Sequence, residues 1–135
     1  MKDTELTQRQ ARDLYRVYKK GLEEGRFSSL RDASDWVRRQ PAPCFYISSK
    51  RASILVGMIQ SGVSLLHQGH NSRRMAWQLF HYYKDYRKEH PDTELSRERI
   101  IELIVDEPAP EFYLTSEAVR HILSAEIKKA REKKW

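Results

Sequence analysis

Cysteine is almost absent from this sequence, because Cys44 is the only one in 135 residues. A single cysteine excludes an intrachain disulfide and a thiolate-rich zinc site built from this chain alone. Long apolar runs are missing too: no stretch of about 18 apolar residues could span a bilayer, and the start, MKDTELTQRQ, lacks the apolar core of a secretory signal. We therefore expect no membrane association and a cytoplasmic location.

The common catalytic motifs are missing as well. The sequence contains no Gly-rich phosphate loop, no HExxH, no nucleophile elbow and no calcium loop. His67, His70 and His81 could gather a metal ion in principle, but no acidic or cysteine ligand recurs beside them at a suitable spacing. We therefore expect a non-enzymatic protein with no metal and no cofactor. The enzymatic alternative is a small nuclease that uses His81, His121 or a carboxylate.

Positive charge is what the sequence has in excess. The formal net charge is +6, which suggests an anionic partner, although such charge also serves solubility. Residues 1–70 contain 12 Lys or Arg against 7 Asp or Glu, whereas residues 71–135 contain 13 against 12. The first half of the sequence therefore carries the basic excess.

Two octapeptides repeat each other. The sequence PAPCFYIS at 41–48 returns as PAPEFYLT at 108–115, which is 67 positions later, with Pro, Ala, Pro, Phe and Tyr in the same order. The match extends leftward, where SLRDASDWVRRQPAP at 29–43 aligns with SRERIIELIVDEPAP at 96–110. The apolar pattern survives where identity does not, which indicates a tandem duplication.

The duplication covers nearly the whole chain. With a two-residue change of offset, LYRVYKK at 14–20 falls on LFHYYKD at 79–85. We therefore predict a first repeat at 1–66, a connector at 67–73 and a second repeat at 74–135, packed as one compact domain.

Each repeat has the pattern of three helices, so the predicted fold class is all-α. Thr7 followed by Gln10 is a capping box, and Ser or Thr residues stand where the later helices should begin. Apolar residues recur at helical spacing in six segments, at about residues 7–25, 29–40, 49–61, 75–90, 97–105 and 116–127.

An extended Pro/aromatic turn should join helices two and three of each repeat. We expect its aromatic side chains to fill the gap between those helices, because aromatic residues contribute the most apolar area there. These side chains are Phe45, Tyr46, Phe112 and Tyr113. The FYI and FYL segments could also pair as short strands across a pseudo-twofold axis.

The start of the third predicted helix opposes its own local stability. Lys50 and Arg51 lie in the first turn, where the helix dipole is positive and cations are disfavoured. Free backbone amides, two cations and the hydroxyls of Ser48 and Ser49 would together anchor a phosphate. We interpret this turn as a candidate functional site.

The same region is similar to a helix-turn-helix. SLRDASDWVRRQ resembles the first helix of that motif and YISSKRASILVGMIQSG resembles its recognition helix, over residues 29–62; YLTSEAVRHILSAEI is similar, within 96–127. The turn QPAPCFYIS is longer than the usual three or four residues. The resemblance implies that Lys50, Arg51 and Ser53 approach bases or phosphates.

By the same resemblance, Arg120 and His121 approach the nucleic acid in the second repeat. Arg38 and Arg39 close the second predicted helix and could add phosphate contacts. The basic segment KKAREKK at 128–134 is typical of a solvated helix end.

The leading functional hypothesis is a DNA-binding accessory or regulatory protein, monomeric or homodimeric, that carries two helix-turn-helix-like repeats. The alternative is a protein-interaction adaptor that receives its partner in an apolar groove between the repeats. The nearly neutral charge balance of the second half favours that alternative.

Overall fold

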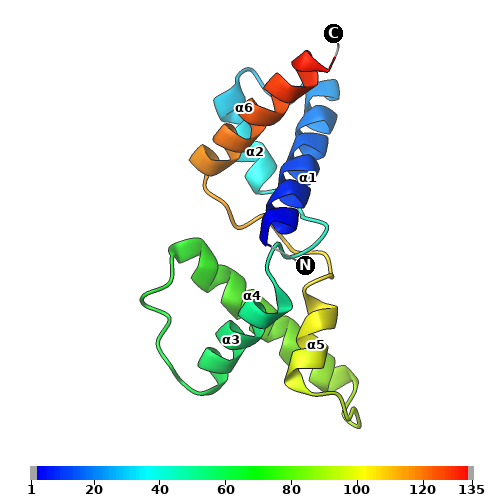
Figure 1. Cartoon of the computed structure of the whole chain (residues 1–135), viewed down its shortest axis with the longest axis vertical. Coiled ribbons are helices and arrows are strands. Elements are labelled where there is room, and N and C mark those ends of the chain that lie inside the picture. The colour runs from blue at the N-terminus through cyan, green and yellow to red at the C-terminus, as the bar shows by residue number, and fades with distance from the viewer. Residues whose placement is uncertain (1–2, 134–135) are drawn as a thin grey trace. The chain divides into compact units, whose positions relative to one another are not determined.

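The computed structural model describes residues 3–133, which form six α-helices and no strand (Figure 1). The all-α prediction is therefore confirmed. The helices are α1 (Asp3–Glu23), α2 (Leu30–Arg38), α3 (Ser49–Gln60), α4 (His70–Glu89), α5 (Arg97–Ile104) and α6 (Ser116–Glu132).

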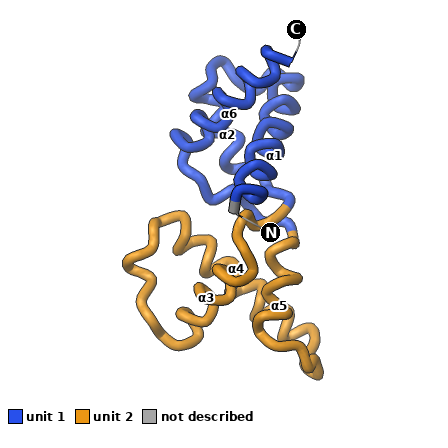
Figure 2. Tube along the Cα trace, viewed as in Figure 1, with its two compact units in different colours: residues 1–43, 108–135 blue, residues 44–107 orange. Residues whose placement is uncertain are grey.

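The chain divides into two compact units (Figure 2). Unit 1 consists of residues 1–43 and 108–135, and unit 2 consists of residues 44–107. Helices α1, α2 and α6 contact one another in unit 1, and helices α3, α4 and α5 contact one another in unit 2. Each unit is therefore a three-helix assembly, and α6 returns from the C-terminal end of the sequence to complete unit 1.

Hydroxyl side chains begin four of the helices, as predicted. In each case the hydroxyl oxygen accepts a hydrogen bond from the backbone N–H three positions further along the chain, which satisfies an amide that has no partner within the helix. The four capping residues are Ser29, Ser48, Ser96 and Thr115.

The predicted starts of the other two helices need correction. Helix α1 begins at Asp3 rather than at Thr7, because Leu6 is buried and the first turn therefore already packs against the core. Helix α4 begins at His70, so part of the predicted connector is helical. No proline follows Gly69 until Pro91, so nothing in that segment prevents an early start.

Glycine ends two helices in the same way. Gly25 has φ +65° and Gly62 has φ +72°, a left-handed conformation that glycine adopts without the steric penalty of a side chain. After α1 the N–H of Arg26 donates to the carbonyl of Gly21, and after α3 the N–H of Val63 donates to that of Met58. Both endings are Schellman motifs.

Each unit has its own apolar core. The largest fully buried side chains of unit 1 are Leu14, Val37, Val119 and Leu123, and those of unit 2 include Phe45, Leu55, Val56, Leu79, Ile100 and Ile101. Phe112 and Tyr113 are buried too, whereas Tyr46 is half-buried. Phe45, Phe112 and Tyr113 are thus buried, but not in a gap between helices two and three of a repeat, because those helices lie in different units.

The two Pro/aromatic segments make matching backbone hydrogen bonds. Ala42 and Ala109 form an antiparallel bridge, with two N–H to carbonyl distances of 2.9 Å. In unit 2 the N–H of Phe45 donates to the carbonyl of Val105, and in unit 1 that of Phe112 donates to the carbonyl of Arg38. Within residues 3–133 FYI and FYL form no strand pair; the bridge lies at the alanines, whose flanking prolines have no N–H to extend it.

Candidate nucleic-acid interface

The residues predicted to contact nucleic acid fall in both units. Those at the start of α3 belong to unit 2, namely Ser49, Lys50, Arg51 and Ser53. Those on α2 and α6 belong to unit 1, namely Arg38, Arg39, Arg120 and His121. Each group is therefore described within its own unit.

The start of α3 is only partly available to a phosphate. Lys50 is exposed, but a guanidinium N–H of Arg51 donates to the side-chain oxygen of Gln68 at 2.8 Å. Ser53 is buried, with 7% of its surface exposed, so its hydroxyl offers little to a ligand. A pocket of about 380 Å³ beside Lys50 is lined by charges of both signs, with Lys50 and Arg97 against Glu98 and Glu102, so it offers no net attraction to an anion.

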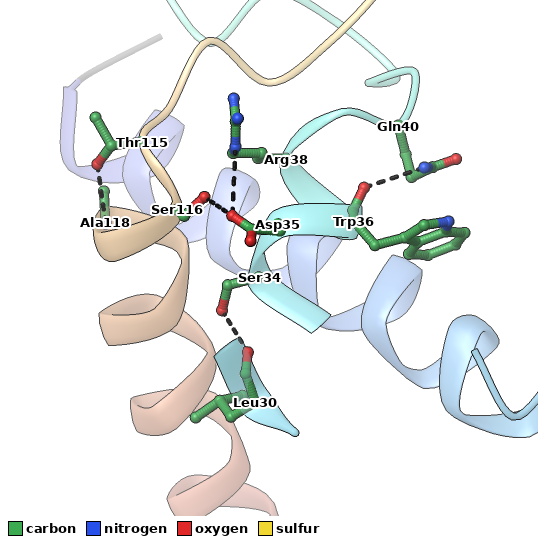
Figure 3. Close-up of polar contacts among 9 residues, drawn as sticks. All are labelled: Leu30, Ser34, Asp35, Trp36, Arg38, Gln40, Thr115, Ser116 and Ala118. Carbon is green, nitrogen blue, oxygen red and sulfur yellow. Dashed lines mark hydrogen bonds and ion pairs between the residues drawn. The ribbon is translucent and has the colours of Figure 1, made fainter. Parts of the chain in front are cut away.

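In unit 1 a polar contact ties the start of α6 to α2 (Figure 3). The hydroxyl of Ser116 donates to the carboxylate of Asp35, and the Nε of Arg38 lies 3.9 Å from the same carboxylate oxygen. The hydrogen bond from Ser116, together with nearby arginines, lowers the pKa of Asp35 against the opposing effect of burial. Asp35 thus stays ionised, with the hydroxyl of Ser116 bonded to it and the guanidinium of Arg38 at ion-pair distance.

A pocket of about 450 Å³ adjoins this contact. Arg31 and Arg120 contribute positive charge to its lining and Asp35 and Glu117 contribute negative charge. The charges of this pocket are therefore balanced, although Arg120 is itself exposed on α6.

Exposed cations are numerous on unit 1. On α6 the exposed basic residues are Arg120, His121, Lys128, Lys129 and Arg131, and on α1 they are Arg12, Arg16, Lys19 and Lys20. Unit 1 contains 16 Lys or Arg against 11 Asp or Glu, a net charge of +5, whereas unit 2 contains 9 against 8, a net charge of +1. The basic excess therefore belongs to unit 1, which combines segments from both ends of the chain. Counting charges in the two halves of the sequence does not reveal this, because the halves do not correspond to the units.

Four aromatic residues of unit 1 lie close together without being fully buried. Tyr15 and Tyr18 of α1, Phe27 of the following loop and Trp36 of α2 are all half-buried. Their ring centres follow one another at 6.1, 5.9 and 5.3 Å. The sequence signal that could have indicated this group is Phe27, an aromatic residue in a short polar loop.

The two helices of each predicted helix-turn-helix do not lie in the same unit. Helices α2 and α3 are consecutive but lie in different units, and so are α5 and α6. The pairs in contact are α2 with α6 and α3 with α5. Helix α6 therefore packs with α1 and α2 in unit 1, and α3 packs with α4 and α5 in unit 2.

The fold and surfaces define a small all-α protein of two three-helix units, one of them strongly basic. Comparisons of the chain with protein-family models, with curated proteins and with solved structures gave no match. None of the helices among residues 3–133 has the length and apolar character needed to cross a bilayer.

Proposed function

We propose that this protein is a non-enzymatic DNA-binding protein of accessory or regulatory type, and that unit 1 makes the main contact with DNA. The observation that carries the proposal is the net charge of +5 on unit 1, with exposed cations along α1 and α6. Clustered Lys and Arg side chains bind duplex DNA by replacing its condensed counterions.

We also infer that the chain arose by tandem duplication and that its repeats exchanged their third helices. Corresponding features support the inference, because the caps Ser29 and Ser96 and the bridged alanines Ala42 and Ala109 are each 67 positions apart. The donors Phe45 and Phe112 and their acceptors Val105 and Arg38 keep the same spacing. Each three-helix unit would then consist of helices one and two of one repeat and helix three of the other.

Within this arrangement α6 is the counterpart of a recognition helix. Arg120 and His121 lie on its exposed surface, and Arg39 is exposed at the end of the neighbouring α2. Glu117, in the first turn of α6, disfavours a phosphate at the very start of the helix. We therefore assign the DNA contacts to the exposed side chains further along α6.

The proposal is tested by binding a labelled 20-base-pair duplex at several salt concentrations and following fluorescence anisotropy. The slope of log affinity against log salt falls by about 0.9 for each phosphate that the protein no longer neutralises. Arg120→Ala with Lys128→Ala should weaken binding and reduce the slope by up to about 2. The matched control is Lys84→Ala with Lys88→Ala, which removes two exposed cations of α4 in unit 2.

The outcome separates the possible interfaces. A larger loss of affinity in Lys50→Ala with Arg51→Ala than in the α6 variant would assign the interface to α3 instead. Absence of duplex binding at moderate salt, or an unchanged slope in the α6 variant, would contradict the proposed role of unit 1.

A protein-interaction adaptor is the second candidate, because exposed apolar side chains concentrate on unit 2. Of the seven large hydrophobic residues exposed among residues 3–133, only Leu22 belongs to unit 1. The other six are Ile54, Val63, Leu66, Trp77, Leu95 and Leu103. An adaptor should leave duplex DNA unretarded, so the same titration distinguishes the two functions.

A further inference from the structure

We propose that four aromatic side chains of unit 1 bind single-stranded nucleic acid by stacking against its bases. These residues, Tyr15, Tyr18, Phe27 and Trp36, are named the ring cluster. The inference rests on the proposed function in taking nucleic acid as the partner, and it adds a second, distinct mode of binding.

The rings of the cluster are arranged as a continuous series. Tyr15 and Tyr18 are 28° from parallel, and Tyr18 and Phe27 are only 2° from parallel. Trp36 meets Phe27 at 60° and closes the series on α2. Successive bases of a single strand stack on aromatic surfaces of this kind with little dependence on sequence.

The ring cluster is more accessible than the aromatic residues of the cores. All four of its rings are half-buried, whereas Phe45 and Phe112 are each only 2% exposed. Gly21 makes room for the cluster on α1, because a side-chain carbon at that position would lie 2.2 Å from the Cζ of Phe27. Phe27 and Trp36 therefore pack against the backbone of α1, and each residue of the cluster keeps part of its surface exposed.

A cation accompanies each end of the series. The Nζ of Lys19 lies 5.6 Å from the ring centre of Tyr15, and the guanidinium carbon of Arg26 lies 5.4 Å from that of Trp36. Both cations are exposed, and Arg26 also pairs with Glu24. Aromatic rings flanked by cations, on a unit with net charge +5, match the planar bases and anionic backbone of a single strand.

Unit 2 contains only part of such a cluster. Phe80 and Tyr83 of α4 match Tyr15 and Tyr18 in the aligned repeats, and the Nζ of Lys84 lies 5.4 Å from the ring centre of Phe80. Leu103 stands at the seventh position of α5, where α2 has Trp36. The loop between α4 and α5, residues 90–96, contains no Phe, Tyr or Trp. Unit 2 therefore repeats the α1 part of the cluster but has no ring at the positions of Phe27 and Trp36, so the complete series belongs to unit 1 among residues 3–133.

Tryptophan fluorescence tests the proposal on the full chain. Trp77→Phe with Trp135→Phe leaves Trp36 as the only tryptophan, and a single strand of 20 thymidines should quench its emission. Measured separately by anisotropy, Trp36→Leu and Tyr15→Leu should each weaken binding of that strand about tenfold. Trp77→Leu, at an exposed tryptophan of unit 2, is the matched control and should leave binding unchanged.

The duplex of the preceding section is titrated in parallel. Quenching by the single strand, with loss of single-strand affinity in both leucine variants and unchanged duplex affinity, supports the ring cluster. If Trp36→Leu loses helical circular dichroism, Tyr15→Leu decides. If the single strand does not quench Trp36, or if the leucine variants bind it as tightly as the wild type, the inference is overturned even where the duplex binds. If the protein binds the single strand but not the duplex, only the proposed duplex function is overturned.

Discussion

At the scale of single residues, glycines with left-handed backbone dihedrals set the ends of α1 and α3. Gly25→Ala should destabilise the fold by about 1 kcal/mol, because a side chain at φ +65° is strained although no atom lies within 4 Å of it. Thermal unfolding followed by circular dichroism measures this destabilisation. Gly25→Asn is the control and should be less destabilised, since asparagine tolerates this region better; an equal effect would contradict the backbone explanation.

The carboxylate of Asp35 gives a prediction about pH. Ser116→Ala removes the hydrogen bond that contributes most to the lowered pKa of Asp35, so the pKa should rise toward its ordinary value. A lowered pKa stabilises the folded state above the unfolded-state pKa, and this stabilisation disappears as the pH falls through the folded-state pKa. The advantage of the wild type over Ser116→Ala should therefore shrink in acid.

Carbon NMR of the Asp35 carboxyl group, recorded across an acid titration, checks this result directly. Ser49→Ala is the matched control, because Ser49 begins α3 of unit 2 as Ser116 begins α6. An Asp35 titration that is unchanged in Ser116→Ala would show that the hydrogen bond does not hold its pKa down.

At the scale of helices, the sequence predicts which segments are helical better than which helices meet. Ser29 and Pro41 bracket α2 as expected, because a hydroxyl cap and a proline act locally. The predicted start of α1 is too late, since burial of Leu6 favours turns that precede the capping-box pattern.

The partners of α3 and α6 could not be predicted from apolar spacing. That spacing defines a face of a helix but not the face it meets. The two helices bury corresponding residues, Ala52 and Val56 on α3 and Val119 and Leu123 on α6. The apolar pattern therefore does not specify which of the two helices completes which unit. For this reason the sequence did not predict that the candidate site residues would fall into two units.

The core position of α6 leads to a stability prediction. Leu123 is fully buried in unit 1, so Leu123→Ala should cost about 2 to 5 kcal/mol of unfolding free energy. Leu103→Ala on α5 is the control, because Leu103 is 49% exposed and its truncation should change stability by only about 0.5 kcal/mol. Urea unfolding measures both variants, and equal destabilisation would contradict the packing assigned to α6.

At the scale of the whole molecule, the packing of the helices predicts which part of the chain folds alone. Fragment 44–107 contains all three helices of unit 2 in one continuous stretch, whereas fragment 1–66 has α1 and α2 without α6. Fragment 44–107 should therefore be helical and unfold cooperatively, and fragment 1–66 should not. Circular dichroism of both fragments during thermal unfolding checks this result. It would be contradicted if fragment 1–66 unfolded cooperatively and fragment 44–107 did not.

The unequal charge of the two units underlies the proposed function, and one measurement tests it most directly. Amide chemical shifts of the ¹⁵N-labelled protein are recorded by NMR while duplex DNA is added. Shifts should concentrate in α6, the exposed surface of α1 and the end of α2, and unit 2 should change little. Shifts confined to α3 and its neighbours in unit 2, or no shifts at a DNA excess in moderate salt, would contradict DNA binding through unit 1.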